Sequence, residues 1–169
     1  MITPVLIQTI PAVTCATIRK KIGQYDDLFP LMMTLGMEMG QQECECDIPE
    51  YCFTHYIELS YKDENILVEV CEAVKEKKED TQMIKYQDFP EVEAACIYHY
   101  GSYQDFPKTY EKILKFIEMN NYEICGHIRE KYIDGVWNKD SQKDWLSQIQ
   151  IQLEKNEYLR MSHRYCSNQ

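Results

Sequence analysis

The stretch Gln-Thr-Ile-Pro-Ala-Val at residues 8–13 returns as Gln-Asp-Phe-Pro-Glu-Val at residues 87–92, 79 residues further along the chain. A run of alternating apolar and polar residues follows each copy, over residues 14–21 and 93–100, which is the pattern of a β-strand. The first strand of the chain is expected to begin at about Ile2. The chain therefore contains an internal repeat.

Each copy then leads into a predicted helix. Apolar residues spaced three and four apart mark one face over residues 28–39 and again over residues 106–117. Two strands close each half, over residues 51–59 and 66–74 with a polar turn at 62–65, and over residues 122–133 and 144–153 with a loop at 134–143. Each half therefore has the order β-α-β-β, and the fold class is α+β.

The repeat also sets the domain organisation. Residues 1–153 are expected to form one domain, with repeat 1 at about 3–74, a charged linker at 75–82 and repeat 2 at about 83–153. Residues 154–169 are a polar C-terminal tail of unknown use. One half has a thin core, so two halves packed about a pseudo-twofold axis would bury each other, and a ligand cleft is expected at their junction.

Composition narrows the function. A net charge of −10 argues against direct nucleic-acid binding. It fits a cationic ligand better, and the alternative is that the acidity only keeps the protein soluble. Thirteen tyrosines suit a pocket or an interface, although many must simply pack in strands. No apolar run approaches the roughly 18 residues of a membrane span, and no signal peptide precedes the first strand, which favours a cytoplasmic protein.

The eight cysteines do not form a zinc motif, because Cys44-x-Cys46 has no partner pair at suitable spacing. The others fall mostly at apolar strand positions, which is typical of free buried thiols in a reducing compartment. These positions are Cys15, Cys52, Cys71, Cys96 and Cys125. We therefore expect neither a metal nor a cofactor.

The chain resembles the GyrI-like family of effector-binding domains, over roughly residues 3–153. The resemblance rests on short motifs in the right order. They are Ile-Pro (10–11), Tyr-Asp-Asp-Leu-Phe (25–29), Val-Glu-Val (68–70), His-Tyr-Gly-Ser-Tyr (99–103), Gly-x-x-Arg-Glu-x-Tyr (126–132) and Asp-Trp-Leu-Ser-Gln-Ile-Gln-Ile (144–151). The resemblance implies a curved antiparallel sheet with helices packed on it. It also implies an amphipathic aromatic ligand, often a cationic drug or dye, held by aromatic side chains and a buried glutamate.

The family glutamate of the last strand is replaced here by Gln148. An amide keeps hydrogen bonding but carries no charge, so the replacement bears on whether the ligand is a cation. Shifting by the repeat period places Glu69 at the corresponding position of the first half. We expect Glu69 to approach the central cleft, because Val68 and Val70 on the other side of the strand have the character of core residues; the alternative is an outward position in water.

The candidate ligand-binding residues combine these anchors with aromatic side chains. They are Glu69, Gln148, Trp145, Tyr132, Tyr103, Tyr51 and Phe53. His99 is expected to be a structural hydrogen-bonding residue. Arg129 and Glu130 alternate on one strand and are expected to be partly exposed.

Three functions remain open from the sequence. The first is a stand-alone protein that sequesters or senses a small aromatic molecule, and the second is the effector-binding part of a transcription regulator. The third is a hydrolase that acts on strained electrophilic molecules with Glu69 as general base and Tyr132 assisting. In each case the expected partner of this chain is a small molecule, and we expect it to bind neither a membrane nor nucleic acid. The sequence leaves open whether the protein is a monomer or a homodimer.

Overall fold

The computed structural model describes residues 3–57 and 65–154. The strands are β1 (Leu6–Ile10), β2 (Val13–Ile22), β3 (Cys52–Tyr56), β4 (Ile66–Ala73), β5 (Lys85–Phe89), β6 (Val92–Tyr100), β7 (Ile124–Asp134) and β8 (Leu146–Leu153). The helices are α1 (Leu28–Gln41) and α2 (Phe106–Met119). Short 3-10 turns at Tyr25–Asp27, Tyr103–Asp105 and Gln142–Asp144 precede α1, α2 and β8.

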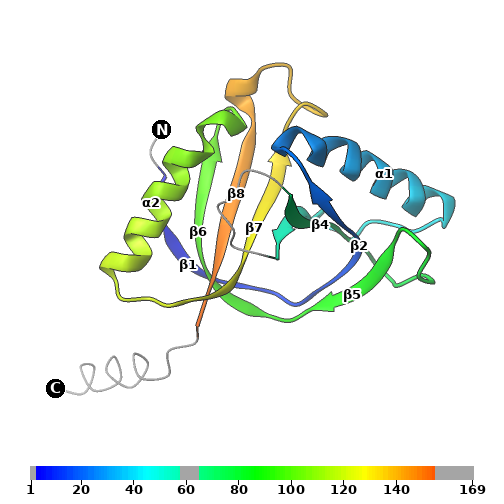
Figure 1. Cartoon of the computed structure of the whole chain (residues 1–169), viewed down its shortest axis with the longest axis horizontal. Coiled ribbons are helices and arrows are strands. Elements are labelled where there is room, and N and C mark those ends of the chain that lie inside the picture. The colour runs from blue at the N-terminus through cyan, green and yellow to red at the C-terminus, as the bar shows by residue number, and fades with distance from the viewer. Residues whose placement is uncertain (1–2, 58–64, 155–169) are drawn as a thin grey trace.

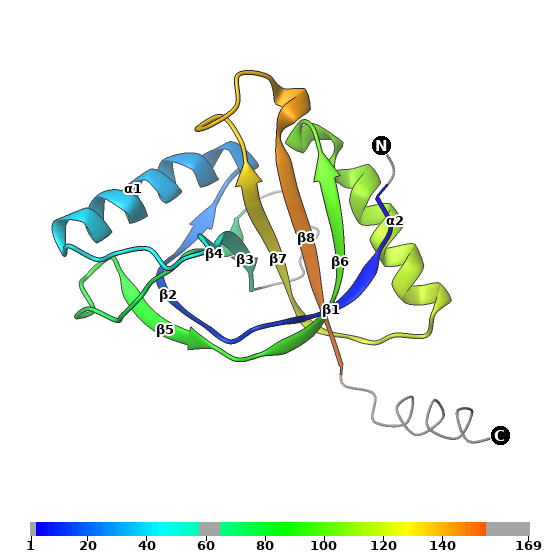
Figure 2. The same cartoon turned by 180° about the vertical axis from the view of Figure 1, so that it is seen from behind.

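The eight strands form one antiparallel sheet in the order β1-β6-β8-β7-β3-β4-β2-β5. The counterparts in the two halves are β1 and β5, β2 and β6, β3 and β7, and β4 and β8. When each strand is replaced by its counterpart, the same strand order is obtained in reverse, so the topology has pseudo-twofold symmetry. The centre of the sheet is the pair β3 and β7. Both helices flank the strands, as Figures 1 and 2 show from opposite sides.

Each half has one strand more than the sequence pattern predicts. The Pro11 and Pro90 positions divide the opening run into two strands, because proline has no N–H to donate to a ladder. The first piece of each run pairs with the other half: β1 pairs with β6, and β5 pairs with β2. Each half therefore supplies an edge strand to its counterpart.

The helices cover one and the same face of the sheet. Helix α1 packs on β2 and β4 through residues that include Leu31 and Leu35, and α2 packs on β6 and β8 through residues that include Ile113 and Ile117. Side chains that oppose one another on neighbouring strands share a face. One such row runs across this face from one helix to the other; it comprises Ile97, Ile149, Glu130, Thr54, Val70 and Ile18.

The structure confirms the α+β class, the antiparallel sheet and the two packed helices. It also confirms that Val68 and Val70 are buried core residues. The cysteine prediction holds for Cys15, Cys71 and Cys96, whereas Cys125 at the start of β7 is exposed. Residues 75–82 contain no helix or strand. The predicted tail beyond Glu154 and most of the turn at 62–65 lie outside the described residues.

Two further findings concern the described part of the chain. It contains no helix that is long and apolar enough to cross a membrane. It also contains no cluster of three or more His, Cys, Asp or Glu side chains that could hold a metal ion.

Candidate ligand site

Glu130 lies on β7 at the centre of the sheet and points to the face that the helices cover. It is 3% exposed and stands directly opposite Thr54 of β3. The expectation that Arg129 and Glu130 would be partly exposed is wrong, since both are buried. The reason is their place on an inner strand: Glu130 faces the helices, and Arg129 on the opposite face lies beside the rings of Phe53 and Phe89.

Four tyrosine hydroxyls surround the Glu130 carboxylate. Tyr110 Oη lies 2.6 Å from Oε1, while the hydroxyls of Tyr56, Tyr132 and Tyr25 lie 2.9, 3.0 and 3.1 Å from Oε2. These tyrosines come from α2, β3, β7 and the turn before α1, so both halves contribute. We call Glu130 and these four residues the Glu130–tyrosine cluster.

Burial controls the ionisation of this cluster. It raises the pKa of the Glu130 carboxyl, and the hydrogen bonds from Tyr110, Tyr56, Tyr132 and Tyr25 counteract only part of that shift. Burial and the neighbouring Glu130 raise the pKa values of Tyr25, Tyr56 and Tyr132, so these three hydroxyls remain protonated donors. The carboxyl is therefore held where its charge is costly and would be stabilised by a cation.

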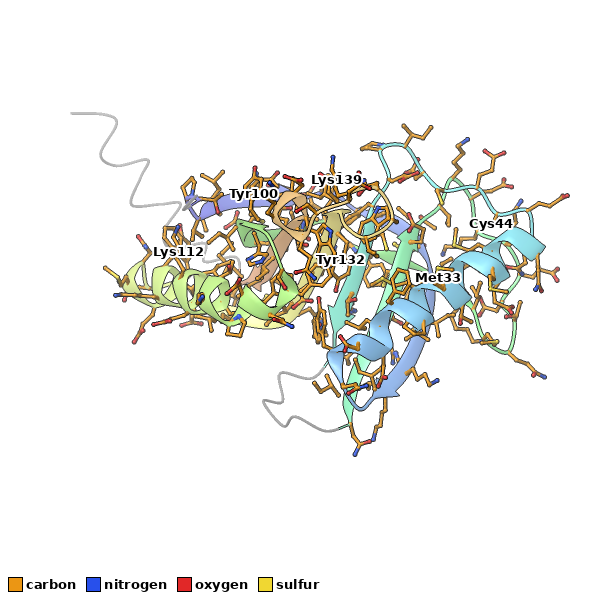
Figure 3. All side chains as sticks on the ribbon, turned by 90° about the horizontal axis from the view of Figure 1, so that it is seen from above. Met33, Cys44, Tyr100, Lys112, Tyr132 and Lys139 are labelled. Atoms are coloured by element: carbon orange, nitrogen blue, oxygen red, sulfur yellow. The ribbon has the colours of Figure 1, made fainter. Side chains whose placement is uncertain are left out.

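Aromatic rings extend the cluster at the start of α2. The Tyr103 ring lies 4.9 Å from Trp145, 5.7 Å from Tyr25 and 5.8 Å from Tyr132, measured between ring centroids. Figure 3 shows Tyr132 between the two helices. The Trp145 Nε1 atom is buried and has no hydrogen-bond partner among the described residues, so its N–H is available to donate a hydrogen bond to a ligand.

Glu69 lies on the opposite face of the sheet. It is 3% exposed, and its carboxylate lies 2.6 Å from Gln87 Nε2, 3.2 Å from His55 Nδ1 and 3.4 Å from an Arg19 guanidinium nitrogen. Burial acts to raise the pKa of this carboxyl, but the hydrogen bonds from His55 and Gln87 and the charge of Arg19 bring it below the usual value. Glu69 is thus a buried and paired anion rather than a side chain in water.

Gln148 occupies the corresponding position on β8. It donates to Gln8 Oε1 at 3.2 Å and accepts from Gln150 Nε2 at 2.9 Å. The contact between Gln148 and Gln8 repeats the contact between Glu69 and Gln87, with both residues displaced by the 79-residue period of the sequence repeat.

The structure therefore divides the expected ligand-binding residues between two faces. Tyr103, Tyr132 and Trp145 lie on the helix side. Glu69 and Gln148 lie on the other side together with Tyr51 and Phe53, whose rings stack 4.5 Å apart. The seven residues cannot line one cleft, and Glu69 cannot act together with Tyr132 because the sheet separates them. His99 is a structural residue, as expected, bound to Thr109 and to the Ser102 carbonyl.

Sequence reasoning missed the members of the Glu130–tyrosine cluster other than Tyr132. A signal was present, because Glu130 and Tyr132 stand two apart in the motif at 126–132 and so share a strand face. Tyr25 and Tyr103 likewise occupy matching places in the two repeats. Neither signal indicates the face of the sheet on which the residues lie.

Two surface hollows lie outside the cluster. One, of about 350 Å³, is lined by residues from the end of β2 and the start of α1, and the other, of about 340 Å³, lies beside the start of α2. Neither includes Glu130. The four tyrosine hydroxyls contact both oxygens of this carboxyl, so a ligand group that binds it would have to displace some of them.

Comparison with known proteins identifies the family. The profile of the GyrI-like small molecule binding domain matches residues 58–154. The crystal structure of the EcmrR C-terminal domain matches with a TM-score of 0.87 and 30% identity, over 92% of this chain and 99% of that one. The chain belongs to the GyrI-like family. The cryo-EM structure of an EcmrR–DNA complex matches with the same TM-score and identity. That match covers 92% of this chain but 59% of the EcmrR chain, so this chain spans about three fifths of the length of EcmrR.

More distant structures share the fold alone. SAV2435 bound to tetraphenylphosphonium has a TM-score of 0.58 at 12% identity, over 92% of this chain and 96% of that one. A hydrolase from Listeria innocua has a TM-score of 0.59 at 12% identity, over 89% of this chain and 91% of that one. None of the curated proteins compared with the chain gives a significant match.

Proposed function

We propose that the chain binds a small amphipathic aromatic cation between its two helices, with Glu130 as the counter-charge and aromatic rings around the ligand. The observation that carries this proposal is the buried Glu130 carboxylate within reach of four tyrosine hydroxyls. Two of those tyrosines come from each half, which supports a ligand position at the junction of the repeats.

The physical argument rests on the cost of the buried charge. Burial raises the pKa of Glu130, so the protein alone stabilises the ionised carboxylate incompletely. A cation in the same low-dielectric space interacts strongly with the carboxylate and favours its ionised form. The faces of tyrosine and tryptophan rings add cation–π attraction, and their area suits a flat apolar ligand.

Ligand entry exchanges tyrosine contacts for ligand contacts. Each hydrogen bond lost from Glu130 costs about 1.5–3 kcal/mol if the carboxylate is ionised, because such bonds are charge-assisted. Tyr25 and Tyr103 lie on the 3-10 turns that precede the helices. Movement of these short turns would displace the rings without breaking the sheet.

The biological role follows from the family. EcmrR is a DNA-bound regulator with a C-terminal domain of this type, and SAV2435 was solved with the aromatic cation tetraphenylphosphonium. We therefore propose that this chain senses or sequesters such a molecule, either as the effector-binding part of a regulator or by itself. A hydrolase using Glu69 and Tyr132 is not proposed, because the two residues lie on opposite faces.

The test uses two ions of similar shape and opposite charge, tetraphenylphosphonium and tetraphenylborate, and isothermal titration calorimetry. We expect wild type to prefer the cation, and Glu130→Gln to weaken cation binding by roughly 10- to 100-fold, the equivalent of a charge-assisted contact. Glu69→Gln is the matched control and should leave cation affinity unchanged. Equal affinity for both ions, or full cation affinity in Glu130→Gln, would refute the proposal.

A further inference from the structure

A row of polar side chains crosses the face of the sheet that the helices leave uncovered. Its members stand directly opposite one another on five adjacent strands, from β8 to β2. They are Gln150, Arg129, His55, Glu69 and Arg19. Three of the five carry or can carry positive charge, although the chain as a whole has a net charge of −10.

Arg129 is the least compensated member of this row. It is 5% exposed, and its guanidinium lies 5.1 Å from the centroid of the Phe53 ring and 5.2 Å from that of Phe89. Its hydrogen bond to Tyr51 Oη is long, at 3.4 Å. Within residues 3–57 and 65–154 no carboxylate lies within ion-pair distance of it. A guanidinium has five N–H donors, so most of this hydrogen-bonding capacity is available to an oxyanion.

His55 places a second uncommitted group beside Arg129. It is 7% exposed, its Nδ1 contacts Glu69, and its Nε2 is buried with no partner among the described residues. Its ring lies 5.5 Å from the centroid of Phe89, the same ring that Arg129 contacts. With Glu69 on Nδ1, protonation of the ring makes Nε2 a donor directed away from that carboxylate.

Two further basic residues, His127 and Lys131, border this region. His127 is exposed, and its ring centroid lies 4.5 Å from that of His55. Burial and the nearby His55 and Arg129 lower the pKa of His127, and burial lowers the pKa of Lys131. Lys131 Nζ lies 5.2 Å from the Tyr51 ring.

The negative charge on this face is already neutralised. Glu69 is paired with His55, Gln87 and Arg19. The side chain opposite Lys131 on β8 is the neutral Gln148. Among the described residues, neither Arg129 nor Lys131 therefore has a carboxylate paired with it.

We propose that Arg129, His55, His127 and Lys131 form a second site that binds a small oxyanion, the carboxylate or phosphate group of a small molecule. The planar guanidinium supplies two parallel N–H donors, and His55 supplies a third when its Nε2 carries a proton. The rings of Phe53 and Phe89 hold the guanidinium in place. The site lies on the opposite face from Glu130 and is independent of the function proposed above.

The test is an NMR titration of the full chain with inorganic phosphate and, separately, with benzoate. The resonances to follow are the imidazoles of His55 and His127 and the Arg129 Nε–H. We expect saturable shifts and a higher pKa of His127 in the presence of the anion. A response to phosphate alone identifies a phosphate site, a response to benzoate alone identifies a carboxylate site, and either supports the proposal.

Variants separate this site from its surroundings. Lys131→Gln and His127→Gln keep the buried row intact and should weaken anion binding about three- to tenfold, as expected for loss of one partly exposed charge contact. Arg129→Lys should weaken anion binding further, because the lysine ammonium lacks the two parallel N–H donors of the guanidinium. Glu130→Gln, a change on the opposite face of the sheet, is the control and should leave anion binding unchanged. Absence of saturable shifts with both anions, or shifts that Lys131→Gln, His127→Gln and Arg129→Lys all leave unchanged, would overturn the proposal.

Discussion

Glu130 and Thr54 stand directly opposite each other on β7 and β3, the two middle strands of the sheet. The Tyr132 hydroxyl lies 3.0 Å from both Thr54 Oγ1 and Glu130 Oε2. The two residues occupy equivalent places in the pseudo-symmetric strand order, yet one is a carboxylic acid and the other an alcohol. The centre of a nearly symmetric fold is therefore chemically one-sided, which allows one charged group of a ligand to be fixed there.

The pH dependence of stability should reveal the buried Glu130. Its pKa in the folded state is raised above the ordinary value of 4.5, so its contribution to stability is fully present below that pH and is lost as pH rises through the folded-state pKa. We expect the free energy of unfolding of wild type, relative to Glu130→Gln, to fall with rising pH above 4.5. Urea denaturation of both proteins across this range measures the difference, and a constant difference would contradict the assignment.

Glu69 should behave in the opposite way. Its folded-state pKa is lowered from 4.5, so its contribution is present above that value and is lost as pH falls through the folded-state pKa. The stability of wild type relative to Glu69→Gln is therefore expected to decline below pH 4.5. The same urea titrations serve as the measurement. If both glutamine variants changed the pH profile in the same direction, at least one of the two environments would be wrongly described.

The shortest of the four contacts to Glu130 should be measurable on its own. Tyr110→Phe removes a hydroxyl that lies 2.6 Å from Glu130 Oε1 and leaves the ring in place. We expect a loss of about 1–3 kcal/mol in the free energy of unfolding, the usual cost of leaving a buried acceptor without its donor. Tyr100→Phe, at an exposed tyrosine, is the control and should change stability by less than about 0.5 kcal/mol.

The exchanged edge strands predict that neither half folds alone. Strand β1 pairs with β6, and β5 pairs with β2. A fragment of either half therefore lacks the edge strand that pairs with its sheet. We propose the halves as residues 3–74 and 83–153, and expect each fragment to be largely unfolded by circular dichroism. Mixing them should restore the native spectrum. A cooperative thermal transition in one isolated fragment would show that the exchange is dispensable.

The sequence predicted the elements better than their partners. Alternation and three-to-four spacing are local properties, so the helices and the strands that follow them were located within a few residues. The separation of β1 from β2 at Pro11 depends on pairing with β6, more than 80 residues away, as in Leu6 opposite Cys96. Local pattern carries no information about such a partner.

The candidate site was predicted in part for a related reason. Residues 129–131 are Arg, Glu and Lys, so charge stands on both faces of β7 and the pattern gives no preferred inner side. Tyr103, Tyr132 and Trp145 were identified as aromatic candidates and do lie together. Glu69 and Gln148 were correctly paired by the repeat, but only the observed register places them on the other face.

The most direct test is a crystal structure of the chain with tetraphenylphosphonium. Our account predicts the cation on the helix side of the sheet, in contact with Glu130 and with the rings of Tyr103 and Tyr132. Density for the cation against Glu69 and Gln148 on the opposite face, with the Glu130–tyrosine cluster unchanged, would contradict it.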